Sequence, residues 1–164
     1  MTRPVVCGTA MMRLRRPLPS FRNSTWGRCA YLAGRYSRRE ELLRYAADLA
    51  RIRIEVRARW LLGLLQYGAD GDRAQFDLGQ DAEMASRFAS EDVEDLIHAD
   101  IVISFTEEPR KPSINRGGRH VEHGMALALQ KRVLVVGHRE NAFHWLPEVE
   151  VFPTWAEALE ALRP

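Results

Sequence analysis

Cysteine is scarce in this sequence, which has two in 164 residues. Cys7 and Cys29 lie far apart along the chain, so no short-spaced pair is available to hold a metal ion. This cysteine usage fits a reducing compartment, and we expect a cytoplasmic protein.

Long hydrophobic runs are also absent. The runs at residues 60–65 and 133–137 fall far short of the roughly 20 residues that span a bilayer, which excludes a transmembrane role. Hydrophobic residues make up 46% and charged residues 28%, close to globular averages, which argues against disorder and against a fibrous repeat. The length suits one domain with its own core.

Acidic residues are missing from the first 28 positions, which hold six arginines. This segment contains prolines and glycines and has no periodicity, so we expect residues 1–28 to form a flexible, Arg-rich extension. The segment could instead be an organelle leader, which the prolines oppose, or translation could start at Met11 or Met12. Residues 29–164 carry 18 basic and 22 acidic residues, a balance that argues against a nucleic-acid-binding surface.

Short apolar runs alternate with longer helical periods from residue 29 onward, which is the pattern of repeated strand and helix units. Strands are predicted over residues 29–33, 52–58, 100–105, 132–136 and 149–152, and helices over 38–50, 80–98, 119–130 and after Thr154. Two of these helix starts carry a capping box, Ser37 with Glu40 and Thr154 with Glu157. We therefore expect an α/β fold, a doubly wound five-stranded parallel sheet of the Rossmann or flavodoxin-like type, as a single domain over residues 29–164, with a loop or lid at 63–79.

Ligands of such sheets bind beyond the carboxyl ends of the strands, which here means residues 34–37 and 106–122. Gly117 and Gly118 precede a predicted helix, where they let the backbone approach a ligand and where free N–H groups suit an anion. Four arginines flank this region and are either phosphate ligands or ordinary surface charges: Arg35, Arg39, Arg116 and Arg119.

Glu122 stands beside a predicted buried stripe of the helix over 119–130, formed by Val121, Met125, Ala128 and Leu129. A carboxylate in a first turn is favoured by the helix dipole and should stay ionised, as a nucleophile must. The simpler interpretation is a solvated glutamate that favours a helix N-terminus.

Asp92 falls on the predicted core-facing stripe of the helix over 80–98, which is formed by Ala85, Phe88, Ala89, Val93 and Leu96. The alternatives are an ion-paired acid at the edge of that stripe and a new helix that begins at Ser90. If Asp92 and Glu122 meet in one cleft, they form the carboxylate pair of glycosidic cleavage, in which one attacks the anomeric carbon and the other handles the leaving-group proton.

His120 and His123 make a metal-dependent hydrolase an alternative. The HExxH spacing is absent and no third ligand is indicated, so we expect no metal ion. A serine or cysteine nucleophile has little support, because neither Cys29 nor any serine lies in a nucleophile-elbow pattern.

Three segments together resemble the nucleoside 2-deoxyribosyltransferase superfamily, which includes 2′-deoxynucleoside 5′-monophosphate N-glycosidases and cytidylate hydrolases. The resemblance covers most of residues 29–159 and is carried by YLAG at 31–34, EDVEDLIHADIVISF at 91–105 and GGRHVEHGMALALQKRVLVVG at 117–137. The last segment is similar to the family pattern E-L-G-x-A-x-A-x-x-K, which is matched by Glu122, Gly124, Ala126, Ala128 and Lys131.

The resemblance implies that Glu122 is the catalytic nucleophile and that Asp92 is an acid near the leaving base. It also implies that Tyr31 and Gly34 line the pocket, and that the segment containing Asn141, residues 140–144, contributes to the neighbouring active site in a dimer.

The sequence departs from the family at two positions. Arg116 stands where deoxyribosyltransferases usually have an aspartate, and His123 replaces the usual leucine. An arginine at position 116 favours a phosphorylated substrate, because a cation near the ribose can bind a 5′-phosphate.

We therefore expect an enzyme that cleaves the N-glycosidic bond of a nucleoside or nucleoside 5′-monophosphate, by hydrolysis or by transfer to another base, through a glycosyl ester on Glu122. The expected substrate-binding residues are Tyr31, Gly34, Arg35, Gly117, Gly118, Arg119 and Asn141. No cofactor is implied, and the expected partners are the small-molecule substrate and a second copy of the chain in a homodimer or higher homo-oligomer. The alternative is a non-catalytic nucleotide-binding or sensor module with the same fold.

Overall fold

The computed structural model describes residues 28–62, 82–107 and 117–164. The predicted extension, apart from Arg28, and the predicted loop or lid at 63–79 lie outside these residues, as does Arg116. Within the described residues, none of the helices combines the length and the hydrophobicity needed to span a membrane.

Five parallel strands form one sheet in the order β2-β1-β3-β4-β5. The strands are β1 (Arg28–Ala33), β2 (Ile54–Val56), β3 (Ile101–Phe105), β4 (Arg132–Val136) and β5 (Val149–Phe152). The predicted five-stranded parallel sheet is therefore confirmed, and its order is that of flavodoxin-like folds, in which the connections diverge between β1 and β3.

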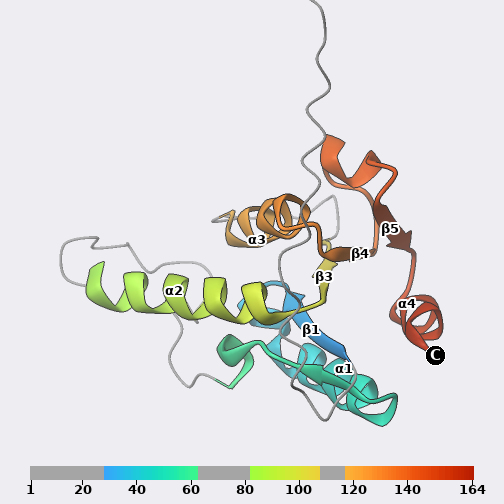
Figure 1. Cartoon of the computed structure of the whole chain (residues 1–164), viewed down its shortest axis with the longest axis horizontal. Coiled ribbons are helices and arrows are strands. Elements are labelled where there is room, and N and C mark those ends of the chain that lie inside the picture. Colours follow the sequence, from blue (N-terminus) through green and yellow to red (C-terminus); the bar gives the residue numbers. More distant parts are fainter. Residues whose placement is uncertain (1–27, 63–81, 108–116) are drawn as a thin grey trace, which may run out of the picture.

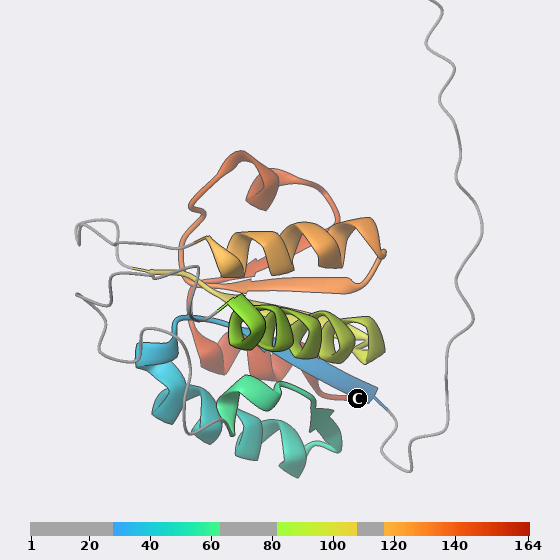
Figure 2. The same cartoon turned by 90° about the vertical axis from the view of Figure 1, so that its left-hand side faces the viewer.

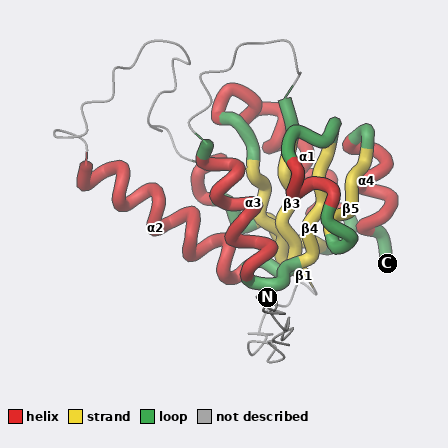
Figure 3. The backbone as a smooth tube through the Cα atoms, turned by 90° about the horizontal axis from the view of Figure 1, so that it is seen from above, coloured by secondary structure: helices red, strands yellow, loops and turns green. Residues whose placement is uncertain are grey.

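Four helices cover the two faces of this sheet: α1 (Arg39–Arg51), α2 (Ala82–His98), α3 (Gly118–Ala128) and α4 (Trp155–Leu162). Helices α2 and α3 lie on one face and α1 and α4 on the other (Figure 1), and the view from above separates the same two layers (Figure 3). Figure 2 looks onto the face that α2 and α3 cover, with β1 and β4 behind them. Covered on both sides, the central strand β3 is buried along its whole length, as a parallel strand requires.

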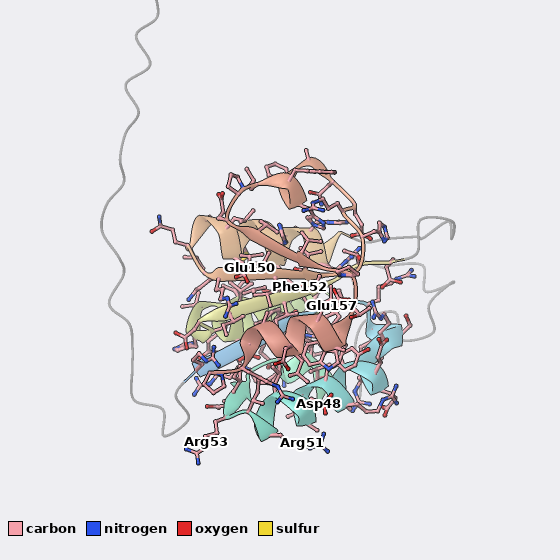
Figure 4. The ribbon with its side chains drawn as sticks, turned by 90° about the vertical axis from the view of Figure 1, so that its right-hand side faces the viewer. Asp48, Arg51, Arg53, Glu150, Phe152 and Glu157 are labelled. Atoms are coloured by element: carbon pink, nitrogen blue, oxygen red, sulfur yellow. The ribbon has the colours of Figure 1, made fainter. Side chains whose placement is uncertain are left out.

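The face formed by α1 and α4 is held together by aromatic side chains. Tyr45 of α1 stacks on Trp155 of α4, with 4.5 Å between the ring centroids, and on Phe105 of β3. The Trp155 indole also donates to Asp48 at 3.1 Å, and Figure 4 shows Asp48 on this face beside α4. These contacts pack α1 and α4 against each other and against β3.

Two local predictions differ from the structure. Ser37 does not cap α1, because residues Tyr36–Arg38 form a short 3-10 helix (η1) and α1 begins without a side-chain cap. Strand β2 is shorter than predicted, since Arg53 has a left-handed backbone with φ 60° and a second 3-10 helix, η2 (Arg59–Leu61), follows closely. The predicted cap at Thr154 is confirmed, because its side chain accepts a hydrogen bond from the Glu157 backbone N–H.

Candidate active site

Tyr31, Asp92 and Glu122 come together from three elements, β1, α2 and α3. The Tyr31 side chain is fully buried, and its hydroxyl donates a hydrogen bond to Glu122 Oε1 at 2.9 Å. The same hydroxyl is hydrogen-bonded to Asp92. Figure 2 shows α2 and α3 side by side on the same face of the sheet. Tyr31 on β1 interacts with an acid from each of these helices.

Burial raises the pKa of both acids. Desolvation is the main cause for Asp92, whose pKa rises to about 6 despite the hydrogen bond from Tyr31, which lowers it. Desolvation and the charge of Asp92 raise the pKa of Glu122 to about 7, against the hydrogen bond from Tyr31 and the charge of Arg119. Two acids in contact with one hydroxyl titrate as a pair, so this pair takes up and releases a proton close to neutral pH.

The expected effect of the helix dipole, which favours ionised Glu122, is opposed here by burial, which raises the pKa of Glu122 to about 7. Helix α3 begins at Gly118 and has no acidic residue in its first turn, so Glu122 lies one turn further on, where the dipole has little effect. Burial against Tyr31 outweighs what remains of it.

The predicted buried stripe of α3 is confirmed only in part, since Met125 and Leu129 are partly buried and pack against the core. Val121 is 63% exposed and Ala128 is exposed, whereas the buried positions are Arg119, His123 and Ala126. Glu122 is half-buried beside this second stripe. Two of its three members are polar, so a pattern of apolar residues does not reveal it.

Asp92 lies on the inward side of α2, as the sequence predicted. It is half-buried, and one turn further on Asp95 and Leu96 are buried. Ala89 and Val93, which were expected on the same stripe, are exposed. The inward face of α2 is therefore narrower than predicted, and two acids lie on it.

The three glycines that the sequence places near the ligand differ in their surroundings. Gly117 precedes α3 with φ 76°, a left-handed conformation that favours glycine, and a Cβ at Gly117 or Gly118 would have no atom of the described residues within 4 Å. A Cβ at Gly34 would lie 2.7 Å from Cδ1 of Leu42. Close packing against Leu42 is therefore enough to account for Gly34, whereas the space beside Gly117 and Gly118 is open.

Arg119 is bound within the protein. Its guanidinium forms an ion pair with Glu140 at 2.6 Å and donates to the Phe105 carbonyl at 2.8 Å. The side chains of Arg119 and Glu140 are only 5% and 15% exposed. This ion pair connects the first turn of α3 with the segment after β4. No local pattern in the sequence predicts it, because the two residues are 21 positions apart.

Arg35 and Asn141, two further predicted substrate-binding residues, lie in the segments that follow β1 and β4. Arg35 follows β1 and is 3.7 Å from the carboxylate of Glu107, which follows β3. Asn141 caps a third 3-10 helix, η3 (Ala142–Trp145), by accepting from the Phe143 N–H at 2.9 Å. Its amide nitrogen is 3.4 Å from His120 Nδ1 on α3.

His123 and His144 form a buried contact that the sequence did not predict, with 4.7 Å between their ring centroids. Burial lowers the pKa of His123 to about 4, and its Nε2 atom has no hydrogen-bond partner among the described residues. Over residues 28–62, 82–107 and 117–164, no group of three or more His, Cys, Asp or Glu side chains is arranged as metal ligands would be.

A groove of about 460 Å³ lies at the β2 edge of the sheet, between α1, β2, η2 and the end of α2. None of Tyr31, Asp92 and Glu122 lines it. The cluster of titratable groups, and not this groove, is therefore the candidate active site.

The comparisons with known proteins find similarity in structure and none in sequence. No family model matches the sequence, and no curated protein matches it by sequence. A 2-deoxyribosyltransferase from Bacillus psychrosaccharolyticus matches 80% of this chain and 90% of its own length, with a TM-score of 0.58 and 16% identity. The chain has the fold of the nucleoside 2-deoxyribosyltransferase superfamily.

A second solved structure supports the same conclusion. The CMP N-glycosidase of Clostridium botulinum matches 82% of this chain and 97% of its own length, with a TM-score of 0.51 and 17% identity. The resemblance drawn from the sequence is thereby confirmed at the level of the fold.

Proposed function

We propose that this protein cleaves the N-glycosidic bond of a nucleoside or nucleoside 5′-monophosphate, with Glu122 as the nucleophile and Asp92 as the acid. The observation that carries the proposal is the Tyr31 hydroxyl hydrogen-bonded to both carboxyl groups within one buried cluster. The structural neighbours, a deoxyribosyltransferase and a CMP N-glycosidase, support the same class of reaction.

The first step forms a glycosyl ester. The Glu122 carboxylate attacks C1′ of the sugar while the bond from C1′ to the base nitrogen breaks, and the base takes the proton of Asp92. In the second step, the oxygen of a water molecule attacks C1′ while the Asp92 carboxylate accepts a proton from that water. The bond from C1′ to the Glu122 oxygen breaks, which releases the sugar and restores Glu122. Attack by a second base in place of water gives transfer.

The reaction requires ionised Glu122 and protonated Asp92, whereas the pKa values of about 7 and about 6 favour the opposite arrangement. A difference of one pKa unit corresponds to a factor of about 10. The Tyr31 hydroxyl offsets this preference because it has one proton and two lone pairs. When the hydroxyl donates to Glu122, Asp92 can form a hydrogen bond with it only by donating its own proton. This arrangement, with Glu122 ionised and Asp92 protonated, is the reactive one.

We assign substrate contacts to residues around this cluster. Gly117 and Gly118 leave open space and N–H groups for an anionic part of the substrate, and Arg35 supplies a partly exposed cation. Arg119 contributes chiefly through its charge, since its guanidinium is bound to Glu140.

A second copy of the chain is the proposed partner. Three large apolar side chains on α3 and η3 are exposed, Val121 at 63%, Phe143 at 63% and Trp145 at 71%. Asn141 directly precedes η3 as its N-cap residue. Packing this surface against a second copy would bury it and bring Asn141 to a subunit boundary.

The test is chromatographic. The wild-type protein, Glu122→Gln and Asp92→Asn are incubated with a panel of nucleosides and 5′-monophosphates, with and without a second base, and released and exchanged bases are quantified. We expect base release by the wild type and a loss of at least about 1,000-fold in Glu122→Gln, as removal of a catalytic nucleophile implies. Glu83→Gln, an exposed acid of α2, is the matched control.

Binding without base release by the wild type would overturn the proposal and leave the nucleotide-binding module in its place. Product containing a second base would identify a transferase, and free sugar or sugar phosphate a hydrolase.

A further inference from the structure

Arg59 joins η2 to the middle of α2. Its backbone N–H donates to Asp95 Oδ2 at 2.8 Å and its Nε to Asp95 Oδ1 at 2.9 Å, so both carboxylate oxygens of Asp95 are engaged. A further nitrogen of the guanidinium donates to the carbonyl of Glu91 at 3.0 Å and to the carboxylate of Glu94 at 2.7 Å. Arg59 thus binds both sides of the helical turn that contains Asp92.

The neighbouring residue joins η2 to the sheet. The Trp60 indole donates to the carbonyl of Leu32 at 2.9 Å in a buried hydrogen bond, and Leu32 follows Tyr31 in β1. Residues 59 and 60 therefore connect the strand that carries Tyr31 with the turn of α2 that carries Asp92. Asp95 is buried, so its bonds to Arg59 are held in a fixed geometry.

We infer that Arg59 is a positioning residue of the active site, which acts through Asp95 and the Glu91 carbonyl to hold Asp92 against Tyr31. This inference rests on the proposed function, because it assigns to Arg59 the placement of the acid that protonates the leaving base. Arg59 itself has no role in contact with substrate.

The charges around Asp92 come from four elements. Tyr31 faces it from β1, Glu122 from α3, and Arg59 from η2, while Glu91 and Asp95 lie on its own helix. The positive charge of Arg59 lowers the pKa of Asp92, and the negative charges of Asp95 and Glu91 raise it. Replacing Arg59 or Asp95 by a neutral residue therefore breaks the same connection but moves this pKa in opposite directions.

The experiment measures kcat and KM for base release across pH in Arg59→Gln, Asp95→Asn and Arg59→Lys. We expect kcat at each variant's own optimum to fall by roughly 10- to 100-fold in the first two, with little change in KM, because a small displacement of a catalytic group has effects of this size. The alkaline limb of the profile moves to higher pH in Arg59→Gln and to lower pH in Asp95→Asn. Arg59→Lys, which keeps the charge, recovers part of kcat.

The matched control is Arg87→Ala, which removes an exposed partner of Glu91 on the same helix at 2.9 Å. It leaves kcat and both limbs unchanged. Circular dichroism confirms that each variant is folded, and Asp95→Asn decides the question if Arg59→Gln does not fold. A folded Arg59→Gln or Asp95→Asn variant with wild-type kcat at its own optimum would overturn the inference. Absence of base release by the wild-type protein would instead overturn the proposed function.

Discussion

The Tyr31 hydroxyl donates its single proton to Glu122 Oε1 over 2.9 Å, inside a cluster where Asp92 is its other partner. A buried hydroxyl in contact with two acids couples their protonation. It also links the sheet to both helices that supply the acids, since the three residues come from β1, α2 and α3.

Replacing this hydroxyl tests its part in the site. In Tyr31→Phe, Glu122 loses the hydrogen bond that lowers its pKa, so the acidic limb of the pH profile of base release should move to higher pH. A hydrogen bond to a charged group contributes about 1.5–3 kcal/mol, which corresponds to a loss of roughly 10- to 100-fold in kcat/KM. Tyr45→Phe removes a hydroxyl bound to Glu41 on the other face and should leave the profile unchanged; equal profiles in all three proteins would refute the role of Tyr31.

The wild-type pH profile is the second prediction. Well below pH 6 both acids are protonated and Glu122 cannot attack, and well above pH 7 both are ionised and no proton is available for the base. The dependence of kcat/KM on pH should therefore be bell-shaped with its maximum between pH 6 and 7. Steady-state rates between pH 4.5 and 9 measure it, and a rate that stays constant from pH 5 to 9 contradicts the assignment.

Glu122 should also lower the stability of the fold at alkaline pH. Its pKa is about 7 in the folded protein against an ordinary 4.5, so the folded state holds this proton more tightly than the unfolded chain. The stabilising effect of that proton is complete below pH 4.5 and is lost as the pH rises through 7. We expect Glu122→Gln to be more stable than wild type at pH 8, by about 2–3 kcal/mol, and the difference to shrink at pH 5.

Urea unfolding at the two pH values measures this difference without any substrate. An equal difference between the two proteins at pH 5 and pH 8 would mean that the Glu122 carboxyl is not buried in solution.

The sequence predicted the sheet well because its strands carry their own local pattern. The run over 133–136 is apolar and lies between Arg132 and Gly137, and both β4 and β5 have the predicted bounds. The start of α1 was predicted less well. Arg38 donates hydrogen bonds to Glu41 and to the Thr106 carbonyl, and α1 begins after Arg38 without the predicted Ser37 cap.

The site could be predicted only in part for a related reason. Glu122 and Asp92 were found from their positions on helices and from a family pattern, and the structure brings them together at Tyr31. The bonds from Arg119 to Glu140 and from Arg59 to Asp95 were not predicted, although Arg119 itself was named as a substrate-binding residue, because the partners in each pair are distant in sequence. Hydrophobic periodicity indicates which apolar residues share one face of a helix, but it does not indicate ion pairs between different elements.

The buried ion pair between Arg119 and Glu140 should be important for stability. In Glu140→Ala the Arg119 guanidinium remains buried without its partner, and breaking such a pair costs about 3–5 kcal/mol. Glu150→Ala is the comparison, because the Arg132–Glu150 pair is 35% and 39% exposed and should contribute no more than about 1 kcal/mol. Urea unfolding at pH 7 measures both, and similar losses in the two variants would contradict the distinction.

His123 should make the fold weaker in mild acid. Its pKa is about 4 in the folded protein, below the ordinary 6.5, so the unfolded chain takes up a proton first as the pH falls. The fold therefore loses stability from pH 6.5 down to about 4, and this loss is about 2 kcal/mol at pH 5. His123→Leu cannot be protonated and also removes a buried nitrogen that has no partner, so its stability relative to wild type should increase between pH 7.5 and pH 5. His138→Leu, an exposed histidine, should show no such increase in urea unfolding at the two pH values, and an equal response of both variants would mean that His123 is not buried.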